Sequence, residues 1–197
     1  MIDNISYELT KDPKLIQKYY EIVKICYWEE LGINIISNES EYEKYNTQSH
    51  FLIIKTTDTV IGGTRLVVNN GHLESRLPLE ESDFLLRNLI KEYPLYRESY
   101  GELCRLAILP SFRNAGVFPK LLYHLVTLSK SFSCNYLFSI APVSQAILYK
   151  QTGKKIGVNI QIRTGINVPE KKVYKSIKER ILLLSCDLRN CSPSNIF

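Results

Sequence analysis

Apolar residues fall at two different spacings along the chain, and the spacing separates helices from strands. Between Asp12 and Gly32 they recur every three or four residues, which is typical of a helix with one buried face. Asp12 followed by Pro13 is a favoured helix start, and Gly32 is a favoured helix end. Short apolar runs predict strands at 5–9, 51–55 and 60–68. The turn at 57–58 joins the last two strands into a hairpin.

The second half of the chain alternates strands with helices. We predict strands at 102–108, 136–140, 156–163 and 180–188, and helices at 82–90, 117–128 and 144–150, while 171–177 could also be helical. Hairpins followed by this alternation favour an α/β fold with a mixed central sheet flanked by helices on both faces. No repeat or linker interrupts the 197 residues, so we expect a single domain over 1–197.

The cysteines and the apolar runs exclude several classes of protein. The five cysteines form no Cys-x-x-Cys pair and have no histidine at metal-ligand spacing. They are therefore expected to be reduced thiols, with no metal site and no redox dithiol. The longest apolar run, residues 181–184, is far shorter than the ~20 residues of a membrane span. No secretory signal is recognisable at the N-terminus, which favours a cytoplasmic protein.

Positive charge is concentrated towards the C-terminus. The formal net charge is +5, and residues 149–190 hold ten Lys/Arg but only three Asp/Glu. A basic face of this kind could attract a nucleotide-bearing cofactor, an acidic carrier protein or nucleic acid, although a solvated basic helix without a partner explains it equally well. The aromatic residues are not interleaved with the basic ones as in a stacking platform, which disfavours nucleic acid.

The segment 106–118 carries the sharpest chemical signal, because it connects the predicted strand at 102–108 to an amphipathic helix. A helix start offers unpaired N–H groups and the positive end of the helix dipole, which suit a phosphate. Gly116 allows close approach of the backbone, and Arg113 adds a guanidinium fork. From the residues alone, an ordinary turn explains a single glycine at a helix start at least as well.

The same segment resembles the pyrophosphate loop of the GCN5-related N-acyltransferase (GNAT) superfamily, through Ile108, Pro110, Arg113 and Gly116. The resemblance implies the GNAT fold and a donor that is an acyl thioester of coenzyme A or of acyl carrier protein. Phe118 departs from the small residue usual at its position, which favours a donor ending in a single phosphate, as on acyl carrier protein. The residues implied to bind the donor are Ala107, Ile108, Arg113, Asn114, Ala115, Gly116, Val117 and Phe118.

A second match to the superfamily lies at residues 148–153, where Leu148, Tyr149 and Gly153 resemble its Leu-Tyr-x-x-x-Gly segment. The resemblance implies that Tyr149 is the catalytic acid that protonates the departing thiolate. Considered alone, Tyr149 is one of thirteen tyrosines and would be assigned to the core or the surface.

A narrower resemblance covers roughly residues 20–110. The segments 30–32, 41–45, 61–66 and 102–108 are similar in order and spacing to the acyl-homoserine lactone (autoinducer) synthases and related N-acyl amino acid synthases. It implies amide formation from a long acyl chain, usually carried on acyl carrier protein. Ile33, Asn46 and Ser49 depart from that pattern, and the last two replace acids that help to hold S-adenosylmethionine. Another amine, such as an amino acid, therefore becomes a comparable candidate for the acceptor.

Amide formation from a thioester needs a neutral amine, a polarised carbonyl and a proton for the leaving sulfur. Glu102 is the candidate base, with an ion pair to Arg65 or Arg105 as its structural alternative. The N–H groups near Ala107 and Ile108 could stabilise the oxyanion. Arg65 and Arg105 follow an alternating pattern that suits a carboxylate on the acceptor, whereas their alternative role is in surface salt bridges.

Three functions remain compatible with the sequence. The first is an N-acyltransferase that moves a medium or long acyl group to the amine of a small acceptor. The second is an acetyltransferase that uses acetyl-coenzyme A on a small amine or a protein. The third is a non-catalytic member of the fold that binds an acyl carrier, a protein or nucleic acid. The three histidines form no recognisable constellation, and we expect His124 to be a packed helical residue.

Overall fold

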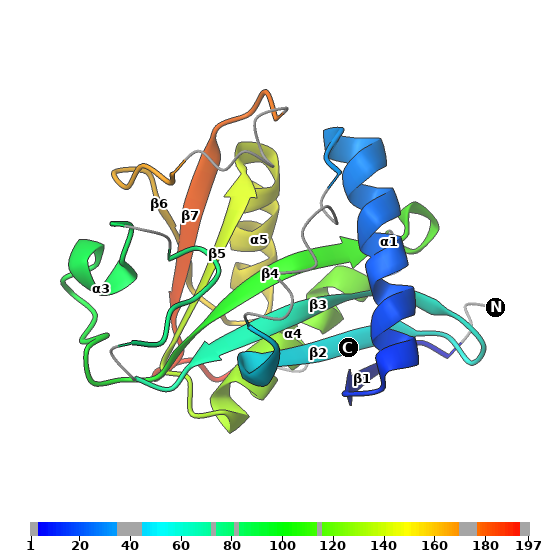
Figure 1. Cartoon of the computed structure of the whole chain (residues 1–197), viewed down its shortest axis with the longest axis horizontal. Helices are drawn as coiled ribbons and strands as arrows, with labels where there is room; N and C mark the ends of the chain where they lie inside the picture. The colour runs from blue at the N-terminus through cyan, green and yellow to red at the C-terminus, as the bar shows by residue number, and fades with distance from the viewer. Residues whose placement is uncertain are drawn as a thin grey trace.

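A single seven-stranded sheet organises the chain, with the strand order β1-β2-β3-β4-β5-β7-β6 (Figure 1). The computed structural model describes residues 4–34, 45–71, 74–80, 83–113, 116–169 and 177–193. The strands are β1 (Ser6–Thr10), β2 (Ser49–Lys55), β3 (Val60–Asn69), β4 (Tyr100–Ile108), β5 (Tyr136–Pro142), β6 (Ile160–Arg163) and β7 (Ile181–Asp187). The helices are α1 (Pro13–Leu31), α3 (Leu86–Leu89), α4 (Val117–Ser131) and α5 (Val143–Lys155), with short 3-10 turns η1 (Asn46–Gln48) and η2 (Pro110–Phe112).

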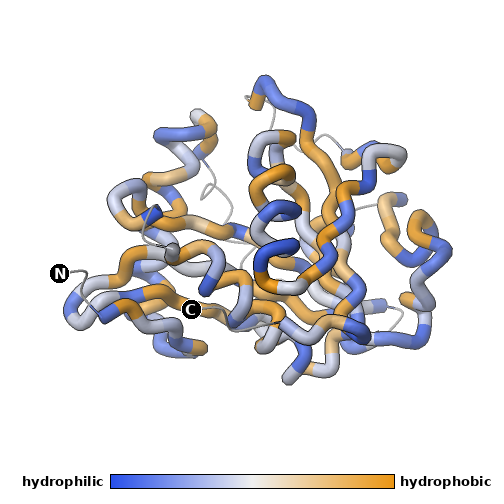
Figure 2. The backbone as a smooth tube through the Cα atoms, turned by 180° about the vertical axis from the view of Figure 1, so that it is seen from behind, coloured by the Kyte–Doolittle hydropathy of each residue, from blue (hydrophilic) through white to orange (hydrophobic). Residues whose placement is uncertain are grey.

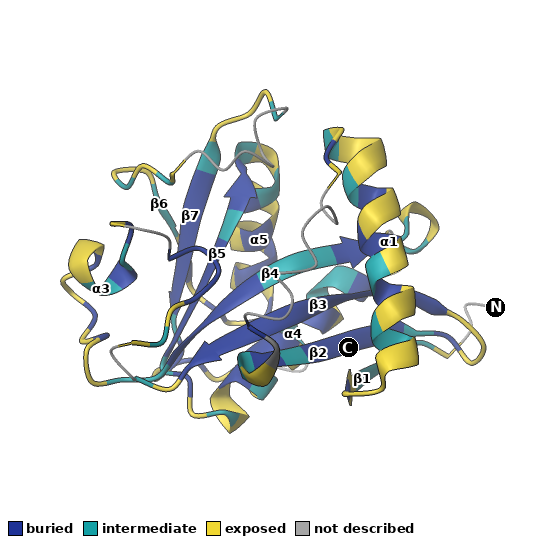
Figure 3. Ribbon diagram, viewed as in Figure 1, coloured by how far each residue is buried: buried dark blue, intermediate teal, exposed yellow. Residues whose placement is uncertain are grey.

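The sheet is mixed, because β4 and β5 pair in parallel whereas the other neighbouring strands pair antiparallel. Helix α1 crosses one face, and α4 and α5 cover the other (Figure 1). The expected α/β architecture with helices on both faces is therefore confirmed. Buried residues fill the strands, and exposed residues lie on the outward sides of the helices (Figure 3). Hydropathy follows the same division, with hydrophobic residues concentrated in the strands (Figure 2).

Helix α1 begins and ends where the sequence predicts. Asp12 caps the start, where its carboxylate accepts a hydrogen bond of 2.8 Å from the Lys14 N–H, and Gly32 adopts φ 63° at the end. The buried side of the helix includes Tyr19 and Val23, which pack against β2 and β3. Helix α1 also contacts β4, where the Cys26 thiol donates a hydrogen bond of 3.6 Å to the Ile108 carbonyl.

Helices α4 and α5 pack on the opposite face, over the larger hydrophobic core. Leu121, Leu122 and Leu125 of α4 are fully buried there, at the three- and four-residue spacing that the sequence shows. Gly153 brings α5 close to the following turn, because a Cβ on Gly153 would lie 2.7 Å from the carbonyl oxygen of Val158. The close approach fixes α5 beside β5 and β6.

Two regions differ from the predicted boundaries, and each difference has a local reason. Helix α5 extends to Lys155, and Gly157 with φ 75° closes the turn that follows, so the strand predicted at 156–163 begins only at Ile160. The helix predicted at 82–90 is reduced to α3, because the Glu80 carboxylate accepts a hydrogen bond from the Leu86 N–H at the helix start. The predicted helix at 171–177 lies almost entirely outside the described residues.

The strands β4 and β5 separate after a short paired stretch. Their register pairs run from Tyr100 with Tyr136 to Glu102 with Phe138 and then stop. Beyond that point the Ser139 hydroxyl donates a hydrogen bond of 2.9 Å to the Leu103 carbonyl. Figure 1 shows the two strands diverging from their common end. In the described part of the chain, no helix has the length and apolar character needed to cross a membrane.

Candidate functional site

A cavity of about 550 Å³ occupies the space between the diverging strands β4 and β5. Its volume lies in the ~300–1,000 Å³ range of small-molecule sites. The lining comes from β4, β5, the end of α1, the start of α4 and one side of α5. It includes Cys26, Tyr27, Glu30, Glu102, Cys104, Arg105, Ala107, Ile108, Arg113, Gly116, Phe118, Ser139, Tyr149, Thr152 and Lys155. The predicted site residues therefore gather around one cavity, with the exceptions described below.

The cavity connects the two faces of the sheet. Cys26, Tyr27 and Glu30 belong to α1, which packs on one face, whereas Gly116 and Tyr149 belong to the helical layer on the other. A paired β4–β5 ladder would separate these groups. Because the ladder stops at Glu102, two ligands can reach the same point from opposite sides.

The predicted phosphate loop borders the cavity at the start of α4. Gly116 adopts φ 69° as the residue before the helix and provides no side-chain cap, so the first N–H groups of α4 have no such partner there. Arg113 donates a 2.8 Å hydrogen bond from Nε to the Ile108 carbonyl and forms an ion pair with Glu30. These contacts place its guanidinium at the rim. Asn114 and Ala115 lie outside the described residues.

Three other residues predicted to bind the donor have side chains in the core. Val117 packs with the helical layer and does not line the cavity. Ala107 packs beneath α1, and the Ile108 side chain packs beneath α4, while both residues still border the cavity. Their contribution to a ligand is therefore restricted mainly to main-chain groups.

Tyr149 and Phe118 form one wall of the cavity. Their rings meet edge to face, with centroids 5.1 Å apart, so Phe118 is directed towards α5. Burial raises the pKa of Tyr149 well above its usual value, which keeps the phenol protonated at neutral pH. Tyr149 lines the cavity, and no hydrogen bond joins its hydroxyl to another described residue.

Glu102 lies at the point where β4 and β5 separate, and its side chain is almost fully buried. One carboxylate oxygen accepts a 2.7 Å hydrogen bond from the Leu79 N–H. This bond fixes the orientation of the carboxylate. Glu102 lines the cavity on the same face of the sheet as Cys104, two residues along the strand.

A β-bulge separates the two predicted acceptor-binding arginines. Arg65 of β3 pairs with Cys104, and Gly63 pairs with Ala107. The interval between the two pairs is therefore two residues on β3 but three residues on β4. Arg105 adopts φ 59° within this bulge, a conformation that is costly for a residue with a side chain. The bulge breaks the simple alternation that the sequence suggested. Arg105 lines the cavity, and Arg65 does not.

Arg65 is only 2 % exposed, so its alternative role in a surface salt bridge is wrong. Its Nε donates a 3.2 Å hydrogen bond to the Cys104 sulfur, whose thiol donates in turn to the Arg65 carbonyl. Burial disfavours the charged guanidinium, but the neighbouring Cys104 and Tyr20 more than offset this effect and raise the pKa of Arg65. Arg65 thus contacts Cys104, which lines the cavity, but does not line the cavity itself.

Some lining residues were not predicted from the sequence. Cys104 follows Glu102 at the two-residue spacing of a strand face, which could have indicated its position. Ser139 and the contribution of α1 carry no comparable signal, since both depend on tertiary packing. His50 and His124 stack on Phe132 and Tyr7 instead of facing the cavity. Among the described residues no group of three or more His, Cys, Asp or Glu could hold a metal ion.

Comparisons with known proteins agree with this architecture. A family model described as the acetyltransferase (GNAT) family matches residues 16–150. The solved structure of FeeM, an N-acyl amino acid synthase from uncultured soil microbes, aligns with a TM-score of 0.68 at 12% identity, covering 95% of this chain and 93% of FeeM. The acyl-homoserine lactone (AHL) synthase LasI aligns with 0.57 at 13% identity, covering 94% and 91%.

A GNAT family acetyltransferase from Elizabethkingia anophelis, solved with acetyl-CoA bound, aligns with a TM-score of 0.55 at 18% identity, covering 94% of this chain and 99% of that chain. A search of curated protein sequences gave no significant match. At these identities the structural similarity establishes the fold alone.

Proposed function

Because the chain belongs to the acetyltransferase (GNAT) family and is an acyltransferase, we propose that it moves a medium or long acyl group from a phosphopantetheine thioester to the amine of a small acceptor that carries a carboxylate. The observation that carries this proposal is the cavity through the sheet. It joins the start of α4 on one face to Glu102 and Arg105 on the other.

The donor fits the side of the cavity formed by α4 and α5. Gly116 and the uncapped N–H groups of α4 suit a phosphate, and Arg113 at the rim adds positive charge. The thioester arm would extend from there between β4 and β5. This arrangement serves coenzyme A and acyl carrier protein equally, because both carry phosphopantetheine.

The acceptor fits the side formed by α1. Arg105 of β4 lines this side of the cavity, and its guanidinium can bind a carboxylate. Glu102 would take the proton of the ammonium group, so that the neutral nitrogen attacks the thioester carbonyl. The new C–N bond forms as the C–S bond breaks.

Two further groups complete the chemistry of the proposal. Main-chain N–H groups near Ala107 and Ile108 would stabilise the oxyanion. Tyr149 would give its phenolic proton to the departing sulfur, for which its raised pKa keeps it in the protonated form. The nitrogen loses two protons, the first from the ammonium group to Glu102 and the second from the tetrahedral adduct to solvent. The sulfur gains one proton from Tyr149, which recovers it from Glu102 through solvent, so that one proton is released to solvent overall.

An acyl group longer than acetyl is supported by the space around the reacting point. The main cavity has about 550 Å³. A second hollow of about 20 Å³, room for about one water molecule, shares Ser139 and Tyr149 with it. The walls of that hollow include Leu122, Leu137 and Ile160. The overall similarity to FeeM and LasI, both synthases of N-acylated small molecules by their names, favours the same class of product here.

A second candidate is an acetyltransferase that uses acetyl-CoA on a small amine or a protein. The similarity to the E. anophelis enzyme with acetyl-CoA bound favours it. A third candidate, a non-catalytic binding protein, is opposed by the position of Glu102 and Tyr149 on one cavity.

One experiment separates the three candidates. The protein is incubated with acetyl and long-chain acyl thioesters, each on coenzyme A and on acyl carrier protein, together with a mixture of amino acids. Released thiol and bound donor are measured. We expect thiol release from long-chain thioesters and N-acylated amino acids by mass spectrometry. Release from acetyl-CoA alone would support the second candidate, and donor binding without release would support the third.

A further inference from the structure

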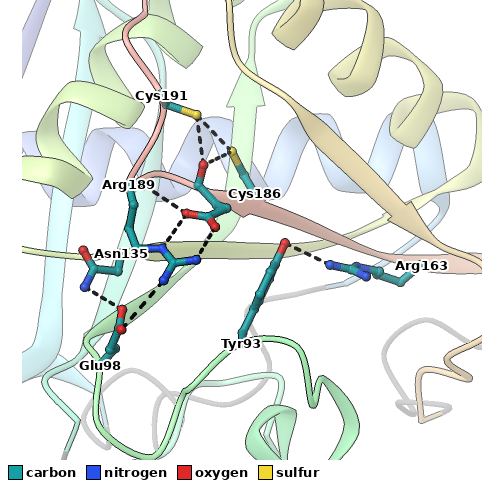
Figure 4. Close-up of polar contacts among 8 residues, drawn as sticks. Tyr93, Glu98, Asn135, Arg163, Cys186, Arg189 and Cys191 are labelled. Atoms are coloured by element: carbon teal, nitrogen blue, oxygen red, sulfur yellow. Dashed lines mark hydrogen bonds and ion pairs between the residues drawn. The ribbon is translucent and has the colours of Figure 1, made fainter.

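Two cysteines that do not line the main cavity lie in contact at the end of β7, and Cys186 borders the small second hollow. The Sγ atoms of Cys186 and Cys191 are 3.9 Å apart, and both residues are buried. Figure 4 shows their sulfurs directed towards one another. The expectation of no redox dithiol rested on the absence of a Cys-x-x-Cys motif, and these two cysteines are separated by four residues instead of two. The structure brings them together through a tight turn after the strand.

The turn that joins the two cysteines is held by several independent contacts. The Cys191 thiol donates a 3.0 Å hydrogen bond to the Asp187 carbonyl, and the Cys191 N–H donates to the Leu188 carbonyl at 3.2 Å. The Asp187 carboxylate accepts two hydrogen bonds from the Arg189 side chain, at 3.0 and 2.6 Å. The two thiols are therefore presented to each other by a preorganised backbone.

The surroundings distinguish the two sulfurs. Cys186 pairs in register with Leu137 and Ile160 and is enclosed by apolar groups. Cys191 lies at the border of this core, where its carbonyl accepts a 2.6 Å hydrogen bond from the Lys130 ammonium. The Cys186 thiol, followed by the Asn159 N–H and Lys130, lowers the pKa of Cys191, whereas the pKa of Cys186 is raised. Cys191 is thus the thiol of the pair that forms a thiolate more readily.

We propose that Cys186 and Cys191 form a reversible disulfide that fixes the C-terminal turn to the end of β7. With a peroxide as oxidant, the Cys191 thiolate attacks one oxygen and becomes a sulfenic acid, with release of water after proton uptake. The Cys186 thiol then attacks the Cys191 sulfur, forming the S–S bond and releasing a second water. Each disulfide consumes one peroxide, and a dithiol restores both thiols by exchange.

The proposal is tested on the full chain without any acyl donor, so the result does not depend on the proposed function. The protein is treated with hydrogen peroxide or diamide, the remaining thiols are alkylated, and the denatured chain is digested with trypsin. Cleavage after Arg180 and Arg189 places the two cysteines on different peptides, 181–189 and 190–197. We expect these peptides to be recovered joined, two hydrogens lighter than their sum, and separate again after dithiothreitol.

Matched variants test the pairing. Cys191→Ser is expected to abolish the joined peptide, whereas Cys104→Ser, which removes a thiol far from the pair, is expected to leave it. The melting temperature should rise by a few degrees on oxidation of the wild type but not of Cys191→Ser. The proposal is overturned if both cysteines are recovered fully alkylated from the oxidised folded chain, or if Cys191 is joined instead to another cysteine or to a second molecule.

Discussion

The two edges of β5 differ in how far they are paired. On one edge β5 pairs with β7 over seven register positions, from Tyr136 with Asp187 to Pro142 with Ile181. On the other edge it pairs with β4 over only three, ending at Glu102 with Phe138. A single strand thus completes the sheet on one side and forms the wall of a cavity on the other.

The residues along the two edges also differ in polarity. The facing strand on the closed edge contributes the buried apolar run Leu182, Leu183 and Leu184. The facing strand on the open edge contributes Glu102 and Arg105, polar groups that a continuous ladder would not need. Because β5 is paired along its whole length with β7, β4 can depart from regular strand geometry at the site without loss of the sheet.

The largest expected effect belongs to the open edge, at Glu102. Glu102→Gln keeps an oxygen that can accept from the Leu79 N–H, so the fold should persist, whereas the proton acceptor is lost. We expect turnover of the long-chain donor to fall about 100-fold or more, with donor binding retained. Steady-state kinetics and donor titration measure this.

Glu80 is the matched control for Glu102. It is also a buried carboxylate that accepts main-chain hydrogen bonds, from Leu77 and Leu86 at 3.0 Å, but it does not line the cavity. Glu80→Gln should lower stability while changing turnover per folded molecule much less. Equal turnover in Glu102→Gln and wild type would remove Glu102 as the base.

The next effect is expected at Tyr149. Tyr149→Phe removes a hydroxyl with no described hydrogen-bond partner, so turnover should fall about 10- to 100-fold with little change in the free energy of unfolding. Tyr100→Phe should show the opposite pattern, because the Tyr100 hydroxyl bonds to Asn69 and Glu80 away from the cavity. Denaturant unfolding and turnover are measured on both variants. A Tyr149→Phe enzyme with wild-type turnover would contradict the assignment.

Ser139 marks the point where the β4–β5 ladder ends, and its removal tests the comparison directly. Ser139→Ala leaves the buried Leu103 carbonyl without this partner and should cost about 1–2 kcal/mol of unfolding free energy. On β7, the strand that faces the closed edge, Ser185→Ala removes an acceptor for Arg163 of β6, which keeps Tyr93 and Glu92 as partners. We expect a smaller loss there. A larger loss for Ser185→Ala in chemical denaturation would reverse the comparison.

The smallest effect is expected for the glycine before α4. Gly116 and Gly32 both have positive φ and open space where a Cβ would lie, so alanine at either should cost about 1 kcal/mol. Only Gly116 of the two borders the cavity. Isothermal titration with coenzyme A should therefore show weaker binding for Gly116→Ala and unchanged binding for Gly32→Ala. Equal affinities in both variants would place the phosphate elsewhere.

The sequence predicts those parts of the fold that local chemistry determines. Asp12 and Gly32 define α1, and the apolar spacing of α4 defines its buried side. The sequence mispredicts element boundaries where a group elsewhere in the chain or a residue with positive φ determines them, as Gly157 does after α5. The family resemblance selected Gly116, Arg113 and Tyr149 as site residues, and the structure places all three around one cavity. Their roles stay predictions.

Other features of the site were beyond sequence reasoning for a physical reason. The β4–β5 ladder ends because main-chain pairing stops after Glu102 and Phe138, and no residue type in the sequence signals where such pairing stops. The bulge at Arg105 adds one position to β4, which shifts the side of the sheet to which later residues point. The expected equivalence of Arg65 and Arg105 assumed an uninterrupted strand and failed for that reason.

The passage through the sheet has a kinetic consequence. If donor and acceptor enter from opposite faces, neither has to vacate the site before the other arrives, and no acylated enzyme has to wait between two half-reactions. Initial-rate measurements at several fixed concentrations of each substrate should then give intersecting double-reciprocal lines, as expected for transfer within one ternary complex.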